Sequence, residues 1–394
     1  MNSPENLNFI QSKLIIINIS RKFSDWLKIQ NMQFTDQEYQ EYKQELDANG
    51  FVVVKAMVTP TRAKELQTGF FDYLERLNPQ IKRNDPKTWS GPQFPSTVNG
   101  IFKNYNVGHI KPLWEARCEP KISEFFQRYW ETKQVIVSFD GVCLLKPNGN
   151  GIPKAPRFHT DQAPKLKFSK EVASVGERYG GDRGFMSIQG ILNLEECGDQ
   201  DGGLYILKGS HKEHSKFFDE SKNRDQTENW YQYANPKRSE VDTDESFALK
   251  LKMGLEYVAK FEKVKVNAKA GDMILFYSRS AHCVVPTEKD SKTFRLAFYI
   301  TMFPKALATK SDLKKRTDAL YNVRTTSHWP CIKFKLNSVN PNSYDGSKEV
   351  ITNFDCAFVK DELEISETML QLTGVSDMKR KQSDSIEVQK KQKK

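Results

Sequence analysis

Two histidines and one aspartate have the residue types and spacing of a metal site. His159 and Asp161 lie two residues apart in RFHTDQAP, and His282 lies in DMILFYSRSAHCVVP. On a β-strand, residues i and i+2 point to the same face, so His159 and Asp161 can reach one metal ion. A later strand can bring His282 into the same coordination shell. Two imidazoles and one carboxylate on one face of an octahedron leave the other positions open, which is the ligand set of non-haem Fe(II) oxygenases.

An arginine downstream fits the same chemistry. Arg295 follows His282 by thirteen residues, in TFRLAFYI. The usual co-substrate of such oxygenases, 2-oxoglutarate, chelates iron at one end and has a free carboxylate at the other. A guanidinium group binds a carboxylate through two parallel hydrogen bonds. We therefore predict that Arg295 binds this carboxylate, with Lys292 as the alternative.

The His-x-Asp motif is weak evidence by itself. With 6 His and 50 Asp+Glu in 394 residues, about one His-x-Asp/Glu match is expected by chance. A second match, His211 and Glu213, indeed occurs, but there the apolar run is already closed by Gly209. His159 instead follows a strand-like run, residues 135–145, and a loop rich in Pro and Gly. This context favours the first match as the metal motif.

Short apolar runs separated by turn residues must position these side chains. They fill residues 135–305 and include FMSIQGILNL, GGLYILKG, DMILFY and RLAFYITM. The pattern predicts a mainly β protein with flanking helices and a double-stranded β-helix core, a cupin-like jelly roll with a pocket between two sheets. In SIQGIL, Gln189 is expected to point inward, toward 2-oxoglutarate or substrate; the alternative is a polar residue on a solvated face. Asp140 is a further pocket candidate.

We divide the chain by composition into a series of segments. A loosely ordered leader (1–31) precedes a helical segment (32–134) that supports the barrel and contains loops (84–108) expected near its mouth. The catalytic core (135–305) carries an insertion (213–253) expected over the entrance. A helix and loop segment (306–370) follows, and within it the Ser-His-Trp-Pro run, with His328, is expected to pack against the barrel. A basic tail (371–394) without aromatic residues is expected to be disordered.

From residue 35 to residue 305 the chain resembles the phytanoyl-CoA dioxygenase family, within the wider Fe(II)/2-oxoglutarate oxygenases. Its signatures occur in the family's order: a helix leading into NGFVVV, then FHTDQ, then the strand pair ending in KGSH, then GDMILFYSRSAHCVVP and FRLAFYITMFP. The resemblance implies that His159, Asp161 and His282 bind Fe(II). It also implies that Arg295 binds 2-oxoglutarate. The sequence departs from the family pattern in two places. The spacing between His282 and Arg295 is longer than in many members, and Lys208 stands where proline is common.

The expected function is therefore that of an Fe(II)- and 2-oxoglutarate-dependent dioxygenase. It would use O2 to hydroxylate a C–H bond of a small organic substrate, with succinate and CO2 as co-products. One alternative is the same chemistry on nucleic acid or protein, and another is a jelly-roll binding module that has lost turnover. The residues do not identify the substrate, a coenzyme A thioester included, or the oligomeric state.

Composition and charge complete the prediction. The 6 cysteines show neither a CxxC pair nor a dense framework, so reduced thiols in a cytoplasmic or nuclear protein fit best. The longest early apolar run, LIIINI, is far too short to span a membrane. The net charge is +10, and residues 379–394 contribute half of it, with 7 Lys/Arg against 2 Asp/Glu. This tail resembles a bipartite nuclear-import signal; a solubilising tail is the alternative.

Overall fold

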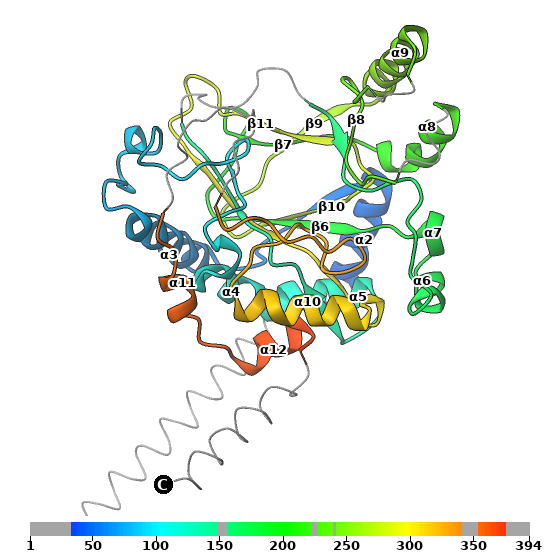
Figure 1. Ribbon diagram of the computed structural model, residues 1–394. Coiled ribbons are helices and arrows are strands. Elements are labelled where there is room, and N and C mark those ends of the chain that lie inside the picture. Colours follow the sequence, from blue (N-terminus) through cyan, green and yellow to red (C-terminus); the bar gives the residue numbers. More distant parts are fainter. Residues whose placement is uncertain (1–32, 148–156, 222–226, 239–241, 341–353, 376–394) are drawn as a thin grey trace, which may run out of the picture.

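The structure is a computed structural model that describes residues 33–147, 157–221, 227–238, 242–340 and 354–375 (Figure 1). The predicted leader, residues 1–31, lies outside these ranges. So do residues 376–394, which make up most of the predicted basic tail, and parts of the predicted insertion. Nothing in the structure therefore bears on the predicted order or disorder of these segments.

The first described helix ends where a glycine makes the turn into a strand. Helix α2 (Asp36–Asn49) begins with a capping box, in which Thr35 accepts from the Glu38 amide and the Glu38 side chain accepts from the Thr35 amide. It ends at Gly50, whose φ of 84° favours glycine. A Cβ at Gly50 would lie 2.4 Å from His211 Nδ1. Strand β1 (Phe51–Val54) follows at once and enters the larger sheet.

Two antiparallel sheets form the centre of the molecule. The six-stranded sheet has the order β1, β10 (Met273–Tyr277), β6 (Ile188–Asn193), β12 (Arg295–Ile300), β4 (Val142–Leu145) and β2 (Ile101–Phe102). The five-stranded sheet has the order β8 (Tyr231–Gln232), β5 (His159–Thr160), β11 (His282–Val285), β7 (Gly203–Leu207) and β9 (Lys263–Val266). Along the chain, strands β4 to β7 and β9 to β12 alternate between the two sheets.

The predicted strand-like run 135–145 is divided in the structure. Strand β3 (Val135–Val137) pairs with β13 (Met302–Pro304) in a separate two-stranded sheet, whereas β4 joins the six-stranded sheet. Between them, the Phe139 amide donates to Thr326 Oγ1 and the Thr326 amide donates to the Phe139 carbonyl. These bonds to the C-terminal segment replace ladder bonds, so the strand cannot continue.

The two sheets face each other across a shared apolar cluster. Strands of the larger sheet and strands of the smaller one both contribute to it. Its members include Phe51, Ile191, Ile274, Phe276 and Ala297 from the first sheet, and Leu204, Ile206 and Val266 from the second. Polar and ionisable residues on the same faces, described below, therefore also point into the space between the sheets.

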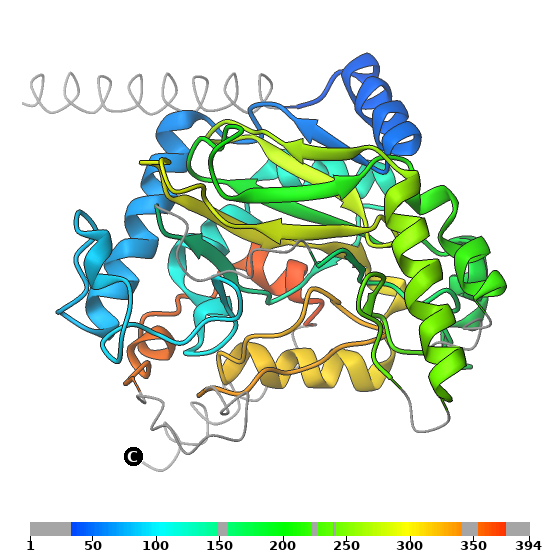
Figure 2. The ribbon, with the colours of Figure 1, turned by 90° about the horizontal axis from the view of Figure 1, so that it is seen from above.

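Helices cover the outer face of the six-stranded sheet and lie beside one end of the smaller sheet. Figure 1 shows α3 (Pro60–Leu77), α4 (Lys111–Arg117), α5 (Pro120–Tyr129), α10 (Lys310–Tyr321) and α12 (Glu367–Thr373) on the side of the six-stranded sheet. Helices α8 (His214–Glu220) and α9 (Asp244–Lys260) lie beside the smaller sheet, as the view from above also shows (Figure 2). The short helices α6 (Ala173–Arg178), α7 (Gly181–Gly184) and α11 (Phe358–Asp361) complete the set in the described ranges. No helix in those ranges is both long and apolar enough to cross a membrane.

Candidate metal centre

The structure brings His159, Asp161 and His282 together. Strands β5 and β11 are antiparallel neighbours, and His159 lies directly opposite His282 in their register. Asp161 comes immediately after β5, and its amide donates to the Ser278 carbonyl at 2.9 Å. One ligand atom from each of the three residues lies within 4.8 Å of the others. Among the described residues, this is the one group of three or more His, Cys, Asp or Glu side chains that could hold a metal ion.

Backbone carbonyls orient both imidazoles. His159 Nδ1 lies 2.9 Å from the Arg157 carbonyl, and His282 Nδ1 lies 2.9 Å from the Ser280 carbonyl. Because a carbonyl only accepts, each Nδ1 must carry the hydrogen, and each neutral ring then has its lone pair on Nε2. The Nε2 atoms lie 3.9 Å (His159) and 3.3 Å (His282) from the carboxylate oxygens of Asp161. Both rings thus present the atom that binds metals to the same point.

Burial and the neighbouring histidines together set the protonation states that a metal needs. Burial, and then His282, lower the pKa of His159 to about 4. Burial acts to raise the pKa of Asp161, but His328, His282 and His159 outweigh it and hold this pKa well below its usual range. Near neutral pH the site therefore has a neutral His159 ring and a carboxylate at Asp161, which are the forms that bind a divalent cation.

Gln189 points inward and contacts the aspartate. Its Nε2 donates to Asp161 Oδ2 at 3.1 Å and to Ser278 Oγ at 3.0 Å. The amide therefore fixes the orientation of the carboxylate from the neighbouring sheet. A contact of Gln189 with 2-oxoglutarate or substrate stays a prediction.

Arg295 is buried in the larger sheet. It is 1% exposed, and its Nη1 lies 2.9 Å from Cys143 Sγ. Its Nη2 is buried and has no hydrogen-bond partner among the residues that the structure describes. Burial acts to lower the pKa of Arg295, but Cys143 and Tyr299 raise it, so the group stays charged. The predicted alternative, Lys292, is exposed.

Sequence reasoning missed the surroundings of His328. This residue was expected to pack the C-terminal segment, and Trp329 does so, with its ring 5.4 Å from that of Phe303. His328 Nε2, by contrast, is buried without a hydrogen-bond partner in the described part of the chain. Burial raises the pKa of Asp140, and His328 is the first group that opposes this. His328 also acts to lower the pKa of Asp161, so its charge influences the candidate metal group. The sequence signal for this was a histidine in a segment otherwise suited to apolar packing.

The second His-x-Glu match has other partners. His211 Nε2 lies 3.1 Å from the Asp47 carbonyl, whereas Glu213 accepts from Lys260 at 2.9 Å. His214 is buried, with Nε2 2.9 Å from the Gln162 carbonyl. These three side chains thus turn to different partners and form no common site.

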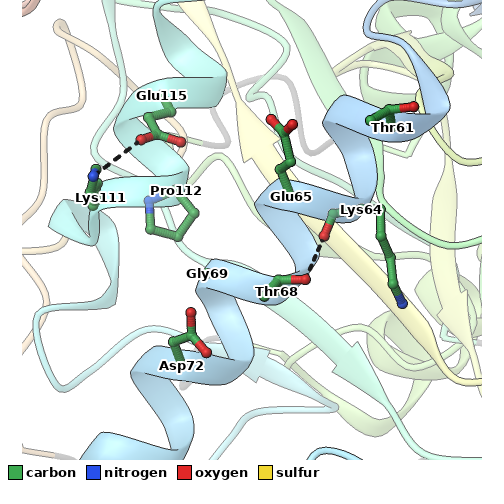
Figure 3. Close-up of a pocket in the computed structure, with 9 residues that line it drawn as sticks. All are labelled: Thr61, Lys64, Glu65, Thr68, Gly69, Asp72, Lys111, Pro112 and Glu115. Atoms are coloured by element: carbon green, nitrogen blue, oxygen red, sulfur yellow. Dashed lines mark hydrogen bonds and ion pairs between the residues drawn. The ribbon is translucent and has the colours of Figure 1, made fainter.

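A surface groove of about 460 Å³ lies elsewhere, between α3 and α4 (Figure 3). Its walls carry charges of both signs, and Lys111 and Glu115 pair across one turn of α4 at 3.8 Å. None of the three clustered residues lines it. The candidate metal group therefore lies outside this groove.

Comparison with known proteins finds relatives along most of the chain. No family model matches. The chain is 28% identical over 305 residues to "Ava biosynthesis cluster protein O" of Aspergillus versicolor, which covers 76% of this chain and 89% of that protein. It is 20% identical over 317 residues to "Putative phytanoyl-CoA dioxygenase" of Dictyostelium discoideum. This alignment covers 74% of this chain and 82% of that protein.

Solved structures superpose on this chain with low TM-scores. The non-heme alpha ketoglutarate dependent carbocyclase SnoK from nogalamycin biosynthesis has a TM-score of 0.42 and 11% identity, over 69% of this chain and 85% of that one. EctD from S. alaskensis, solved with 2-oxoglutarate and 5-hydroxyectoine, has a TM-score of 0.40 and 13% identity. This overlap covers 70% of this chain and 78% of EctD.

Proposed function

We propose, because this chain is related to the phytanoyl-CoA dioxygenase-like Fe(II)/2-oxoglutarate oxygenases, that it hydroxylates a C–H bond of a small organic substrate. The family resemblance predicted from the ordered signatures is confirmed. The enzyme class is that of the 2-oxoglutarate-dependent oxygenases, whose cofactor is Fe(II). The particular reaction, the substrate and the residue roles given below are our proposals.

The convergence of His159, Asp161 and His282 carries the proposal. Both imidazoles have Nδ1 committed to a carbonyl and Nε2 directed at the Asp161 carboxylate. We assign these three residues as the ligands of Fe(II). Three protein ligands leave open coordination positions, which the chemistry of this class requires.

We assign Arg295 to the distal carboxylate of 2-oxoglutarate. The buried Nη2 of Arg295 lacks a hydrogen-bond partner in the described ranges, and an unpaired buried donor is costly unless a ligand satisfies it. A carboxylate would satisfy it and neutralise the buried charge. Burial also favours Arg295 over the exposed Lys292 for this role.

We infer that the two facing sheets form a double-stranded β-helix. Strands β4, β6, β10 and β12 lie in one sheet, and β5, β7, β9 and β11 lie in the other. An eight-stranded chain that alternates between two antiparallel sheets in this way is a jelly roll. In such a fold the space between the sheets opens at one end, where β5 and β11 carry the proposed ligands.

When bound, iron supplies the chemistry by which the substrate, 2-oxoglutarate and O2 give the hydroxylated product, succinate and CO2. The protein's residues position and protect this reaction. Gln189 and the two carbonyls orient the ligands, Arg295 holds the co-substrate, and the apolar cluster excludes water.

The proposal of a small substrate is supported by the Aspergillus relative, whose name places it in a biosynthesis cluster. The alternative of a nucleic-acid substrate depended on residues 379–394, which lie outside the described residues.

In the decisive experiment, full-length protein is loaded with Fe(II) under anaerobic conditions and mixed with 2-oxoglutarate. O2 is then admitted, and the release of succinate is measured. Slow release without added substrate is expected for the wild type, and it should vanish in His159→Ala. The matched control is His211→Gln, which alters the other His-x-Glu motif outside the proposed site and should keep the activity.

Measurements of Fe(II) and 2-oxoglutarate binding, read together with succinate release, distinguish an enzyme from a binding module that has lost turnover. Calorimetry should show that the wild type binds Fe(II) and then 2-oxoglutarate. If neither binds, or if His159→Ala retains full succinate release, the proposed function is wrong. If both bind and no succinate forms with any substrate, a binding module that has lost turnover is the better description.

A further inference from the structure

A large aromatic side chain lies beside the proposed metal ligands and is still open to solvent. Trp230 is 49% exposed, although tryptophan has a strong tendency to be covered. Its ring centroid lies 5.7 Å from that of His159, with 37° between the ring planes. An apolar surface left open next to a polar site is typical of a surface that a ligand covers.

Strand register places Trp230 on the face of the sheet that carries the metal residues. His159 pairs with Gln232, and Thr160 pairs with Tyr231. Gln232 therefore shares the face of His159. Trp230 directly precedes β8, and its ring contact with His159 shows that it lies on this same face. Tyr231 points the other way, into a cluster with Phe217, Phe218 and Tyr257.

The backbone around Trp230 is anchored on both sides. Before it, Asn229 Oδ1 accepts from the Ala163 amide at 3.3 Å. After it, the Tyr233 amide donates to the Phe158 carbonyl at 3.0 Å. The Tyr233 ring stacks on Tyr257 of α9 with centroids 4.5 Å apart. The indole is therefore presented from an ordered support, which lowers the entropy cost of binding against it.

A second ring, that of His328, carries a buried polar atom and acts electrostatically on both His159 and Asp161. His328 Nε2 is buried and has no hydrogen-bond partner within the described ranges. The segment that carries it is held in place by the two hydrogen bonds between Thr326 and Phe139. A buried nitrogen without a partner is satisfied when a ligand supplies a complementary polar group.

We propose that Trp230 forms an aromatic wall of the substrate site, and that the substrate carries a flat conjugated or aromatic ring that stacks on it and a polar group that reaches His328. This inference rests on the proposed function, because it locates the substrate beside the proposed iron ligands. It narrows the substrate class from any small organic molecule to planar, ring-containing ones.

The test uses two probes that differ in ring flatness. Indole-3-carboxamide has a flat ring and an amide, and cyclohexanecarboxamide has the same amide on a puckered ring. Dissociation constants are measured by NMR on full-length protein loaded with Zn(II) and 2-oxoglutarate, so that no turnover occurs. The wild type should prefer the flat probe, and Trp230→Ala should weaken its binding about fivefold, whereas Trp230→Phe should stay within about twofold of the wild type.

Further variants separate stacking from general damage. Trp230→Ala should leave binding of the puckered probe unchanged. Leu249→Ala, which removes another exposed apolar side chain (53% exposed), should affect neither probe. His328→Leu should weaken both probes, because both have the amide, and His328→Gln should restore part of the binding.

Several results would overturn the inference. These are equal binding of the two probes to the wild type, no binding of either, or unchanged flat-probe binding in Trp230→Ala. Failure of the proposed function is distinguishable, because it appears without any probe as a loss of Fe(II) or 2-oxoglutarate binding to the wild type.

Discussion

At the scale of single residues, Asp161 shows how neighbouring side chains prepare the proposed metal site. Its carboxylate lies near the Nε2 atoms of both histidines and accepts a hydrogen bond from Gln189, which is held in turn by Ser278. Side chains that orient a ligand in this way matter for metal affinity nearly as much as the ligand does. Arg295 and Gln189 can each be tested by one substitution.

Replacing Gln189 by Leu should weaken metal binding while the fold is retained. The leucine keeps a similar volume but cannot donate to Asp161, so the carboxylate loses its orientation. We expect the dissociation constant for Co(II), measured by visible absorption, to rise by on the order of tenfold or more. Gln189→Glu should be worse, since a second carboxylate would face Asp161. Unchanged Co(II) binding in Gln189→Leu would contradict this role.

Replacing Arg295 by Gln should weaken 2-oxoglutarate binding specifically. The neutral amide removes the buried positive charge, and we expect on the order of a hundredfold increase in the 2-oxoglutarate concentration needed for half-maximal succinate release. Metal affinity should change little. Lys292→Gln, the matched control at an exposed position, should behave as the wild type. A large effect of Lys292→Gln would instead favour the lysine as the carboxylate partner.

At the scale of elements, the site depends on very short strands that are held in place by packing against other parts of the molecule. Strand β5 has 2 residues and is flanked by β8, also of 2 residues, and by β11. Such strands have little stability of their own. Helix α9 supports β8 by close contact, since Gly254 lies where a Cβ would come 1.8 Å from the Tyr233 carbonyl oxygen.

Gly254→Ala should therefore destabilise the protein although alanine favours helices. The higher helix propensity of alanine would by itself stabilise the protein by about 1 kcal/mol. The new methyl group, however, must push α9 away from β8. We expect a net loss of about 1–3 kcal/mol in the free energy of unfolding, measured with urea. Gly184→Ala, where a Cβ would meet nothing within 4 Å, is the control. Equal stability of the two variants would show that α9 does not depend on this contact.

At the scale of the whole molecule, a large core under the six-stranded sheet contains a neutral histidine. His109 is 1% exposed; its Nε2 lies 3.0 Å from the Arg324 carbonyl, and its Nδ1 accepts from Trp114 Nε1 at 3.3 Å. These two hydrogen bonds require a neutral His109 ring, because a proton on Nδ1 would face the N–H group of Trp114. Burial, and then Arg117, lower the pKa of His109 to about 3.

His109 should make the fold sensitive to acid. The unfolded chain binds a proton near the ordinary pKa of 6.5 and the folded chain only near 3, so stability falls as the pH decreases between these values. For one such group the slope is about 1.4 kcal/mol per pH unit. His109→Gln, which can still donate to Arg324, should flatten the slope by that amount in metal-free protein. Denaturant unfolding at pH 6, pH 5 and pH 4.5 measures it. Parallel slopes for variant and wild type would contradict the prediction.

The sequence determined the composition of the proposed site and the kind of fold that holds it. Periodicity and turn residues predicted the strands of the two sheets, because these signals are local. A local signal of the same kind, Gly50, ends the first described helix in the structure. The ordered signatures predicted the family. The residue pair His159 and Asp161 was separable from His211 and Glu213 because local context differs between them.

Only the tertiary structure decided which distant groups meet. The break in the run 135–145 follows from hydrogen bonds with Thr326, nearly two hundred residues away in the chain. The contact of Gln189 with Asp161 joins different sheets, and the placement of Trp230 depends on strand pairing with β5. Such contacts arise from packing between remote segments, and neither periodicity nor spacing encodes which segments will pack together.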